Sequence, residues 1–187
     1  MVVGALIALD LWSKAAVFRW LTENEHELVR DACGHYRHHV LGEGVGWLTF
    51  MKIENPGAAF GKFANSPHIL VGLRVAAVLG LGWMIARARK GTPWFTAALL
   101  LVLAGALGNL YDNLFLPAAD GHPYGKVRDF IDVYFGVWDW HFPTFNVADS
   151  CITVGAVVLL IGSLLGGDRD ASESEPEKRE DAGASGS

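Results

Sequence analysis

The chain of 187 residues carries a formal net charge of −5 at pH 7, with 15 lysines and arginines against 20 aspartates and glutamates. It has no basic stretch interleaved with aromatic residues, which excludes nucleic acid as a partner. Hydrophobic residues make up 51% of the chain, yet the mean hydropathy is only +0.27, because the apolar residues are concentrated in blocks. Apolar blocks separated by polar connections indicate a membrane protein that is mainly helical.

Four blocks approach the roughly 20 apolar residues that a membrane-spanning helix needs. They cover about residues 2–21, 69–86, 93–110 and 145–165. We interpret the first block as a retained helix and not as a cleaved signal peptide, because a charge interrupts it and no small-residue cleavage site precedes Arg19. Every block contains polar residues that only a bundle interior or a wet cavity would accommodate: Asp10, Lys14, Arg74, Asn109, Asn146 and Asp149.

A basic cluster of Arg87, Arg89 and Lys90 lies in the short link between the second and third blocks. The positive-inside rule places this link, and with it both termini, in the cytoplasm. The two long connections, residues 22–68 and 111–144, then lie on the outer side of the membrane.

The C-terminal segment, residues 167–187, is rich in Gly, Ser, Ala and charge, which predicts a disordered cytoplasmic tail. It holds seven acidic and three basic residues, so the rest of the chain has thirteen acidic and twelve basic residues. The acidity of the chain therefore says little about its folded part, which we expect to be one four-helix domain over residues 1–166.

Two segments of the outer connections predict strands. Residues 46–54 alternate weakly and end at the turn-forming residues 55–57. The aromatic-rich segment 133–142 fits a membrane-interface belt or a short strand. We expect a small β-sheet on the outer membrane surface. One face of its first strand would carry Trp47, Thr49, Met51 and Ile53.

Two aspartates, Asp129 and Asp149, flank the start of the last apolar block. An ionised carboxylate in hydrocarbon costs several kcal/mol, or its pKa shifts until the group is neutral, so a carboxylate retained there indicates a functional site. Two neighbouring carboxyl groups share a proton, and this makes acid/base chemistry the leading hypothesis. The alternative for Asp149 is a helix-capping role in the first turn.

Five short clusters follow one another along the chain, and in this order they resemble signal peptidase II, the lipoprotein signal peptidase family, over about residues 5–165. The clusters are Asp10-Leu11-Trp12-Ser13-Lys14, Asn55-Pro56-Gly57-Ala58-Ala59-Phe60, Gly108-Asn109-Leu110-Tyr111-Asp112-Asn113, Val127-Arg128-Asp129-Phe130 and Phe145-Asn146-Val147-Ala148-Asp149.

The resemblance implies an intramembrane aspartic endopeptidase of the bacterial inner membrane. Such an enzyme removes the signal peptide from prolipoproteins by cutting before a cysteine that carries diacylglycerol, with no metal and no cofactor. Its partners would be these substrates and membrane lipid, and we expect a monomer with its active site near the outer face. Asp129 and Asp149 match the catalytic pair. The positions that match site-lining or supporting residues are Asn55, Gly57, Asn109, Asp112, Asn146, Asp10, Lys14 and Arg128.

The chain also departs from the family pattern. Asn113 stands where the family has arginine, and Arg128 or Lys126 would have to supply the missing charge. Residues 22–46 look inserted, and the stretch between Asn113 and Asp129 is longer than usual.

Several roles stay open at this stage. Asp10 and Lys14, spaced as an intrahelical pair, could be structural or could contact substrate. Asp112 and Asn109 are more easily explained as hydrogen-bonding partners at the end of the third helix. Asp132 is expected to face solvent or an interface amide. Arg74 is expected to extend to the outer interface.

Other functions were weighed against the peptidase. A small proton- or cation-coupled membrane transporter could use Asp10, Asp129 and Asp149, but the chain has no internal repeat and two of these acids lie at one membrane edge. An inactive, lipoprotein-binding relative would fit the departure at Asn113. The remaining polar candidates are interpreted as loop histidines and unpaired thiols, not as metal ligands or a disulfide: His35, His38, His39, His141, Cys33 and Cys151.

Overall fold

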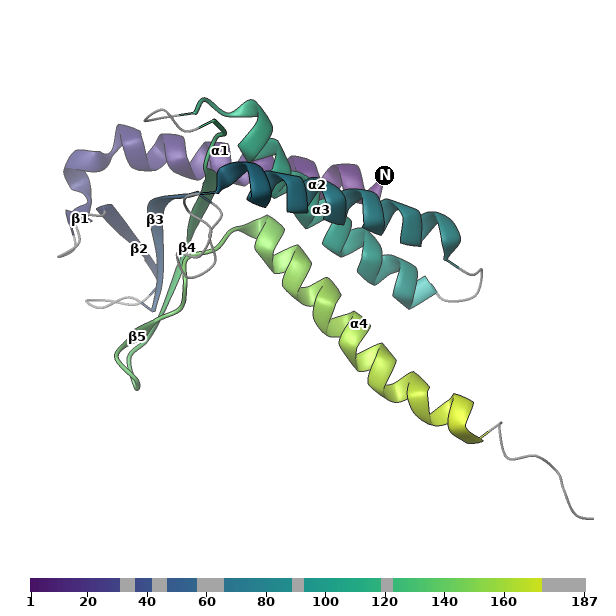
Figure 1. The fold of residues 1–187 in the computed structure, drawn as a ribbon. Helices are drawn as coiled ribbons and strands as arrows, with labels where there is room; N and C mark the ends of the chain where they lie inside the picture. Colours follow the sequence, from purple (N-terminus) through teal and green to yellow (C-terminus); the bar gives the residue numbers. More distant parts are fainter. Residues whose placement is uncertain (31–35, 42–46, 57–65, 89–92, 119–122, 173–187) are drawn as a thin grey trace, which may run out of the picture.

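Four α-helices and one antiparallel sheet make up the computed structural model, which describes residues 1–30, 36–41, 47–56, 66–88, 93–118 and 123–172. The helices are α1 (Val2–Glu23), α2 (Pro67–Arg87), α3 (Pro93–Phe115) and α4 (Val147–Ser172), with a short 3-10 helix η1 (Glu25–Glu27) after α1. Prolines begin α2 and α3, where a first-turn position needs no amide donor. The sheet lies at one end of the helices, and α4 slants away from the other three (Figure 1).

The third helix is the centre of the bundle, because α3 packs against α1, α2 and α4. Glycines allow the closest approaches. A β-carbon at Gly105 would overlap the carbonyl oxygen of Ala148, and one at Gly108 would lie 2.5 Å from a carboxylate oxygen of Asp10. The packing therefore brings polar groups of α1 and α4 against the C-terminal half of α3.

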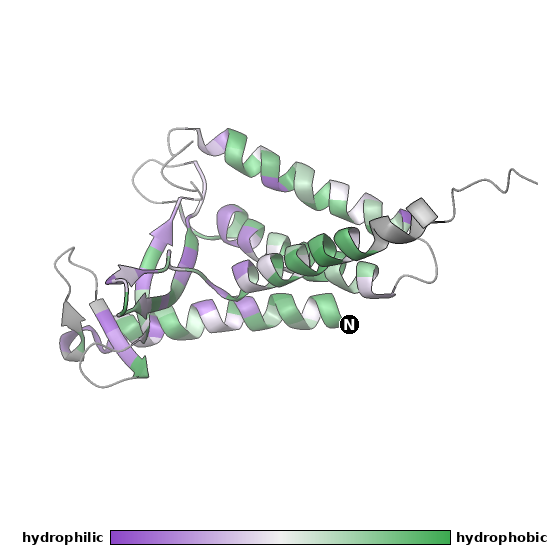
Figure 2. Cartoon of the chain, turned by 90° about the horizontal axis from the view of Figure 1, so that it is seen from below, coloured by the Kyte–Doolittle hydropathy of each residue, from purple (hydrophilic) through white to green (hydrophobic). Residues whose placement is uncertain are grey.

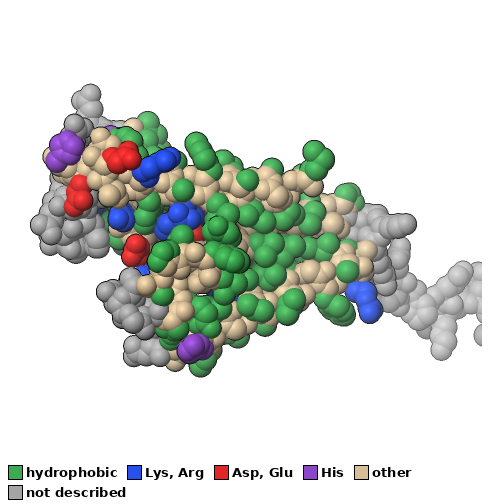
Figure 3. Space-filling view, turned by 90° about the horizontal axis from the view of Figure 1, so that it is seen from above, with side chains coloured by type: hydrophobic (Ala, Val, Ile, Leu, Met, Phe, Trp, Pro, Cys, Tyr) green, Lys and Arg blue, Asp and Glu red, His purple; other side chains and the backbone are tan. Residues whose placement is uncertain are grey.

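Three helices of the described chain are long and apolar enough to cross a membrane: α2, α3 and the part of α4 from Val147 to Leu165. Four spans were predicted, but α1 does not meet the same criterion, since it carries Asp10, Lys14, Arg19 and Glu23. The hydropathy colouring shows mainly apolar helices and a mixed, more polar sheet end (Figure 2). In the space-filling view, hydrophobic side chains cover the helical body and most charged side chains gather near the sheet (Figure 3).

The sheet has five strands in the order β1-β2-β3-β4-β5, and every neighbouring pair is antiparallel. The strands are β1 (Val29–Arg30), β2 (Tyr36–Leu41), β3 (Leu48–Asn55), β4 (Val127–Phe135) and β5 (Trp140–His141). In β3, Thr49 and Met51 are buried and Lys52 is exposed, which confirms the predicted strand; of the four residues expected on one face, Trp47 lies before the strand and is 53% exposed. Strand β4 pairs Asp129 with Ile53, so the sheet carries one predicted catalytic residue directly.

Two predicted helix ends need correction. Helix α3 continues to Phe115, so Asp112 and Asn113 belong to the helix and not to the outer connection. Helix α4 continues to Ser172, past the predicted start of the tail, and the later tail residues lie outside the described chain. The segment 133–142 contains the end of β4 and all of β5, which form a hairpin.

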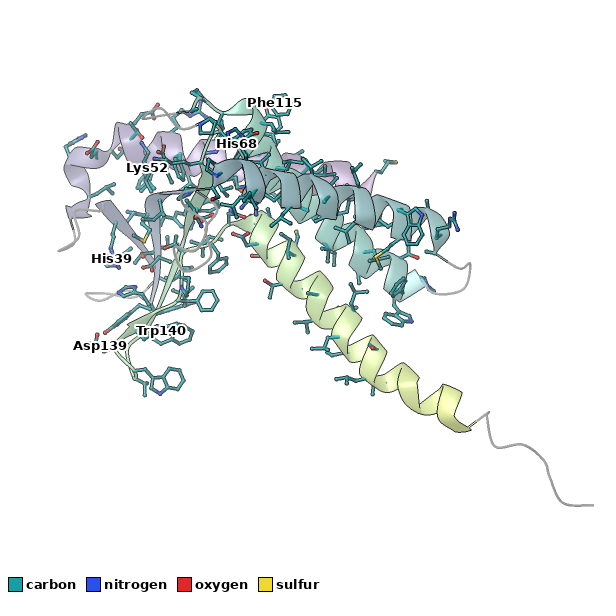
Figure 4. The ribbon with its side chains drawn as sticks, in the orientation of Figure 1. His39, Lys52, His68, Phe115, Asp139 and Trp140 are labelled. Carbon is teal, nitrogen blue, oxygen red and sulfur yellow. The ribbon has the colours of Figure 1, made fainter. Side chains whose placement is uncertain are left out.

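The tip of this β4–β5 hairpin is apolar and exposed. Asp139 and Trp140 lie there, away from the helices (Figure 4). Val137 and Trp138 are 90% and 72% exposed. Asp139 has a φ of 48°, a left-handed conformation that aspartate tolerates in tight turns. These side chains lie where an interface belt was expected.

Candidate active site

Nine of the ten predicted site residues are described, and the fold brings them together where α1, α3, the start of α4 and the β3–β4 pair meet. Gly57, the tenth, lies outside the described residues. Tertiary packing is responsible for the assembly, because the residues come from five separate elements. They are Asp10, Lys14, Asn55, Asn109, Asp112, Arg128, Asp129, Asn146 and Asp149.

Asn146 joins the two candidate catalytic aspartates. Its side-chain amide donates a 2.6 Å hydrogen bond to Oδ1 of Asp129, and its backbone N–H lies 3.2 Å from Oδ2 of Asp149. Asn146 is fully buried and Asp129 is 2% exposed, while Asp149 is half-buried. A single buried residue therefore contacts both carboxyl groups at the start of α4.

Asp149 is also part of a capping box. Its backbone N–H donates to Oδ1 of Asn146 at 2.9 Å, while its carboxylate accepts from the Asn146 N–H, the reciprocal pattern that begins many helices. The capping alternative for Asp149 is therefore correct as local structure. It leaves the second carboxylate oxygen available, and that oxygen accepts a 2.7 Å hydrogen bond from Asn109.

Two further amides orient the pair. Asn55, the last residue of β3, donates to Oδ2 of Asp129 at 2.9 Å. Asn109 on α3 donates to Asp149 and accepts from Asn146 at 3.2 Å. Each carboxyl group thus has donors that fix its direction, and Asn109 contacts the site directly instead of only ending its helix.

A buried ion network supports the pair from the α1 side. Lys14, which is 0% exposed, lies 2.8 Å from Asp10 and 3.4 Å from Asp112, and donates to Asn109 at 2.9 Å. The predicted Asp10–Lys14 pair is therefore confirmed. Asp10 also accepts the backbone N–H of Ala148 at 2.8 Å, which ties α1 to the first turn of α4.

Asp112 links this network to the sheet. Arg128 donates to it from its side chain at 2.8 Å and from its backbone at 3.0 Å. Because the Arg128 side chain is committed to Asp112, it is not placed to substitute for an arginine at position 113. Asp112 is completely buried, in agreement with its predicted structural role.

Burial changes the chemistry of Asp129. Loss of hydration raises the pKa of its carboxyl group from the ordinary 3.8 to about 6, and the nearby charge of Asp149 acts in the same direction. Hydrogen bonds from Asn55 and Asn146 oppose the rise, because they favour the ionised form. A carboxyl group with this pKa can hold and release a proton at mild pH.

Arg74 turns toward α3, whereas it was expected to extend to the outer interface. Its guanidinium donates to the side-chain oxygen of Asn113 on α3. Its signal in the sequence was a lone charge in the middle of an apolar helix. Which face of α2 it occupies depends on packing against α3.

Asp132 was also predicted wrongly, since it is 2% exposed. It accepts a 2.7 Å hydrogen bond from Thr49 and lies 3.0 Å from His141 and 3.2 Å from Arg37. These partners cross three strands and hold the sheet together. No contact between Asp132 and the aspartate pair is found among the described residues, so it stays outside the candidate site.

Cys151 on α4 is free and half-buried, whereas Cys33 and His35 lie outside the described residues. His38 and His39 belong to strand β2, not to a helix that would align imidazoles. His141 contacts Asp132 and Arg37.

Fold and site together define a membrane protein with a buried, amide-braced carboxyl pair at the sheet end of its helices. Two solved structures of bacterial membrane enzymes have the same fold, each with a TM-score of 0.62. One is 21% identical and the match covers 95% of this chain and 92% of that one; the other is 22% identical, with 87% and 89% covered.

Sequence comparison identifies the family. A family model described as signal peptidase (SPase) II matches residues 2–165. The lipoprotein signal peptidase of Mycobacterium avium is 36% identical over 169 residues, which cover 90% of this chain and 80% of that protein. That of Solibacter usitatus is 34% identical over 171 residues, with 87% and 88% covered. The chain belongs to the signal peptidase II family.

Other relatives match a shorter part. The lipoprotein signal peptidase of Pseudomonas aeruginosa is 45% identical over 115 residues, which make up 57% of this chain and 60% of that protein. The match thus covers less than two thirds of the length of this relative.

Proposed function

We propose that this chain is an endopeptidase of the bacterial inner membrane that removes signal peptides from prolipoproteins, cutting before a diacylglyceryl-modified cysteine. Family membership supports the substrate class. The observation that carries the mechanism is the pair of carboxyl groups braced by Asn146, with Asp129 2.6 Å from its amide and Asp149 3.2 Å from its backbone N–H.

The proposed reaction uses water and one shared proton. The ionised carboxylate of the pair takes a proton from a water molecule as the water oxygen bonds to the scissile carbonyl carbon, and the protonated carboxyl group gives its proton to the carbonyl oxygen. The resulting gem-diol collapses when the C–N bond breaks: the amine nitrogen takes the proton from the carboxyl group that had accepted it from water, and a gem-diol hydroxyl gives its proton to the other carboxylate as the C=O bond re-forms. No covalent enzyme intermediate forms, and the pair returns to its starting state.

The topology we propose places the site at the outer face of the membrane, with both termini in the cytoplasm. Arg87 at the end of α2 and the N-terminus of α1 lie at the end of the bundle away from the sheet (Figure 1). The positive-inside rule assigns this end to the cytoplasm. A lipid-anchored cysteine would then present its upstream peptide bond to the pair from the outer leaflet.

Cleavage of a diacylglyceryl-modified prolipoprotein peptide by the purified protein in detergent tests this proposal. Wild type should cleave, and Asp129→Asn and Asp149→Asn should each lose at least about 100-fold in kcat, because acid/base groups contribute on that order or more. Asp132→Asn, three residues along the same strand, is the matched control and should retain activity per folded molecule. Cleavage by both pair variants would reject the mechanism, and an inactive, folded wild type would favour the non-catalytic relative or the transporter.

A further inference from the structure

Arg74 has a position that the reaction scheme above does not explain. It is the only lysine, arginine, aspartate or glutamate between Pro67 and Ala86. A charge in such a helix is costly unless it is paired or has a function. Its side chain points at α3, into the region of the candidate active site, and not out of the bundle.

Asn113 fixes the direction of the Arg74 side chain. The amide nitrogen of Asn113 donates to the carbonyl oxygen of Gly125 at 2.8 Å. The amide oxygen must therefore point the other way, and it accepts from Arg74. Because Asn113 is 3% exposed, this contact is sheltered from water and the guanidinium is held in one place.

The charges in contact around the site leave one negative charge to be balanced. Lys14 and Arg128 face Asp10 and Asp112, so these four groups are neutral as a set. A pair of Asp129 and Asp149 that shares one proton carries a single negative charge. In a site of low dielectric, a nearby cation stabilises such a charge in addition to the amide donors.

We propose that Arg74 is a positioning residue that serves as the counter-ion of the aspartate pair and favours the state in which Asp149 is ionised and Asp129 holds the proton. The inference rests on the proposed function above. Arg74 donates to Asn113 and Asp149 accepts from Asn109, which lies one helical turn before Asn113 on α3, so the guanidinium and the half-buried carboxylate of Asp149 contact the same stretch of that helix. Asp129, by contrast, has the carboxyl group whose pKa burial raises to about 6, which suits it to hold the proton.

The other charged groups that face the pair come from three elements and remain in every variant below. They are Asp10 and Lys14 of α1, Asp112 of α3 and Arg128 of β4.

The test combines a pH–rate profile with infrared titration of the protonated carboxyl band, which is assigned by its loss in Asp129→Asn. In Arg74→Gln, both the acid limb of the profile and the midpoint of the band should move up by about one pH unit, at the lower end of what an opposite charge causes. Arg74→Lys keeps the charge and should keep both values near wild type. Arg87→Gln, at the far end of the same helix, is the control and should change neither.

A relocated charge gives a second arm. Arg74→Ala combined with Asn113→Arg should return both midpoints toward wild type, whereas Arg74→Ala alone should not. If folded Arg74→Gln cleaves more slowly but both midpoints are unchanged, the counter-ion role is overturned. Arg74 would then act only through the packing of α2 against α3. The infrared arm separates the two proposals: if wild type does not cleave but the band still shifts, the function fails and the counter-ion stands.

Discussion

The free energy of unfolding of Asp129→Asn, relative to that of wild type, should increase as the pH rises. The carboxyl group has a pKa of about 6 when folded and an ordinary value of 3.8 when exposed. Between these values the folded state binds more protons than the unfolded state, so the wild type loses stability as the pH rises through this window. Above about pH 6 the full cost of a buried, ionised carboxylate is present.

The size of this effect follows from the two pKa values. A difference of roughly two units, at about 1.4 kcal/mol per unit, gives about 3 kcal/mol of pH-dependent stability. The asparagine side chain has nearly the shape of the protonated acid and does not titrate, so any fixed cost of altered hydrogen bonds with Asn55 and Asn146 cancels between the two pH values. The stability of Asp129→Asn minus that of wild type should therefore increase by about 3 kcal/mol between about pH 3 and pH 7.

Thermal unfolding in a non-ionic detergent, followed by tryptophan fluorescence, measures this difference. At about 2–4 °C per kcal/mol for a chain of this size, the gap in Tm should change by roughly 6–12 °C across the window. Asp129→Glu is the control, because it keeps a titrating carboxyl group and should retain much of the pH dependence of wild type. If the Tm of Asp129→Asn minus that of wild type stays constant with pH, the assignment of a raised pKa is refuted. If this difference falls as the pH rises, the site favours the ionised form.

Two predictions concern the bundle that carries the site. Gly105→Ala should destabilise the protein by about 1–3 kcal/mol, because the new β-carbon overlaps the backbone of Ala148. Gly80→Ala on α2 is the control: nothing lies within 4 Å of its new β-carbon, so this variant should be neutral or slightly stabilising. Equal Tm values for the two variants would contradict this packing. Lys14→Met should cost about 3–5 kcal/mol by leaving buried carboxylates unpaired, and adding Asp10→Asn should recover part of that loss in the same unfolding assay. No recovery in the double variant would mean that the lysine stabilises mainly through its other partners.

Local sequence patterns predicted much of the secondary structure. The apolar blocks predicted the helices, and alternation predicted strand β3, because both depend on spacing within a few residues. The ends were less accurate: α3 runs on to Phe115 and α4 to Ser172, since tertiary packing and continued helical propensity extend elements beyond their apolar centres. The polar residues of α1 set it apart from the three helices whose composition fits a membrane span.

The candidate site also contains contacts within one element, which local spacing predicts, and contacts between distant elements, which it does not. The sequence was sufficient to predict contacts over one helical turn: the Asp10–Lys14 pair is present, and the capping alternative for Asp149 is correct, with Asn146 as its partner in the structure. The contact of Arg74 with Asn113 and the burial of Asp132 in the sheet became visible only in the folded chain. Helical spacing fixes neighbours on one element, whereas the direction that a side chain faces depends on which distant element packs against it.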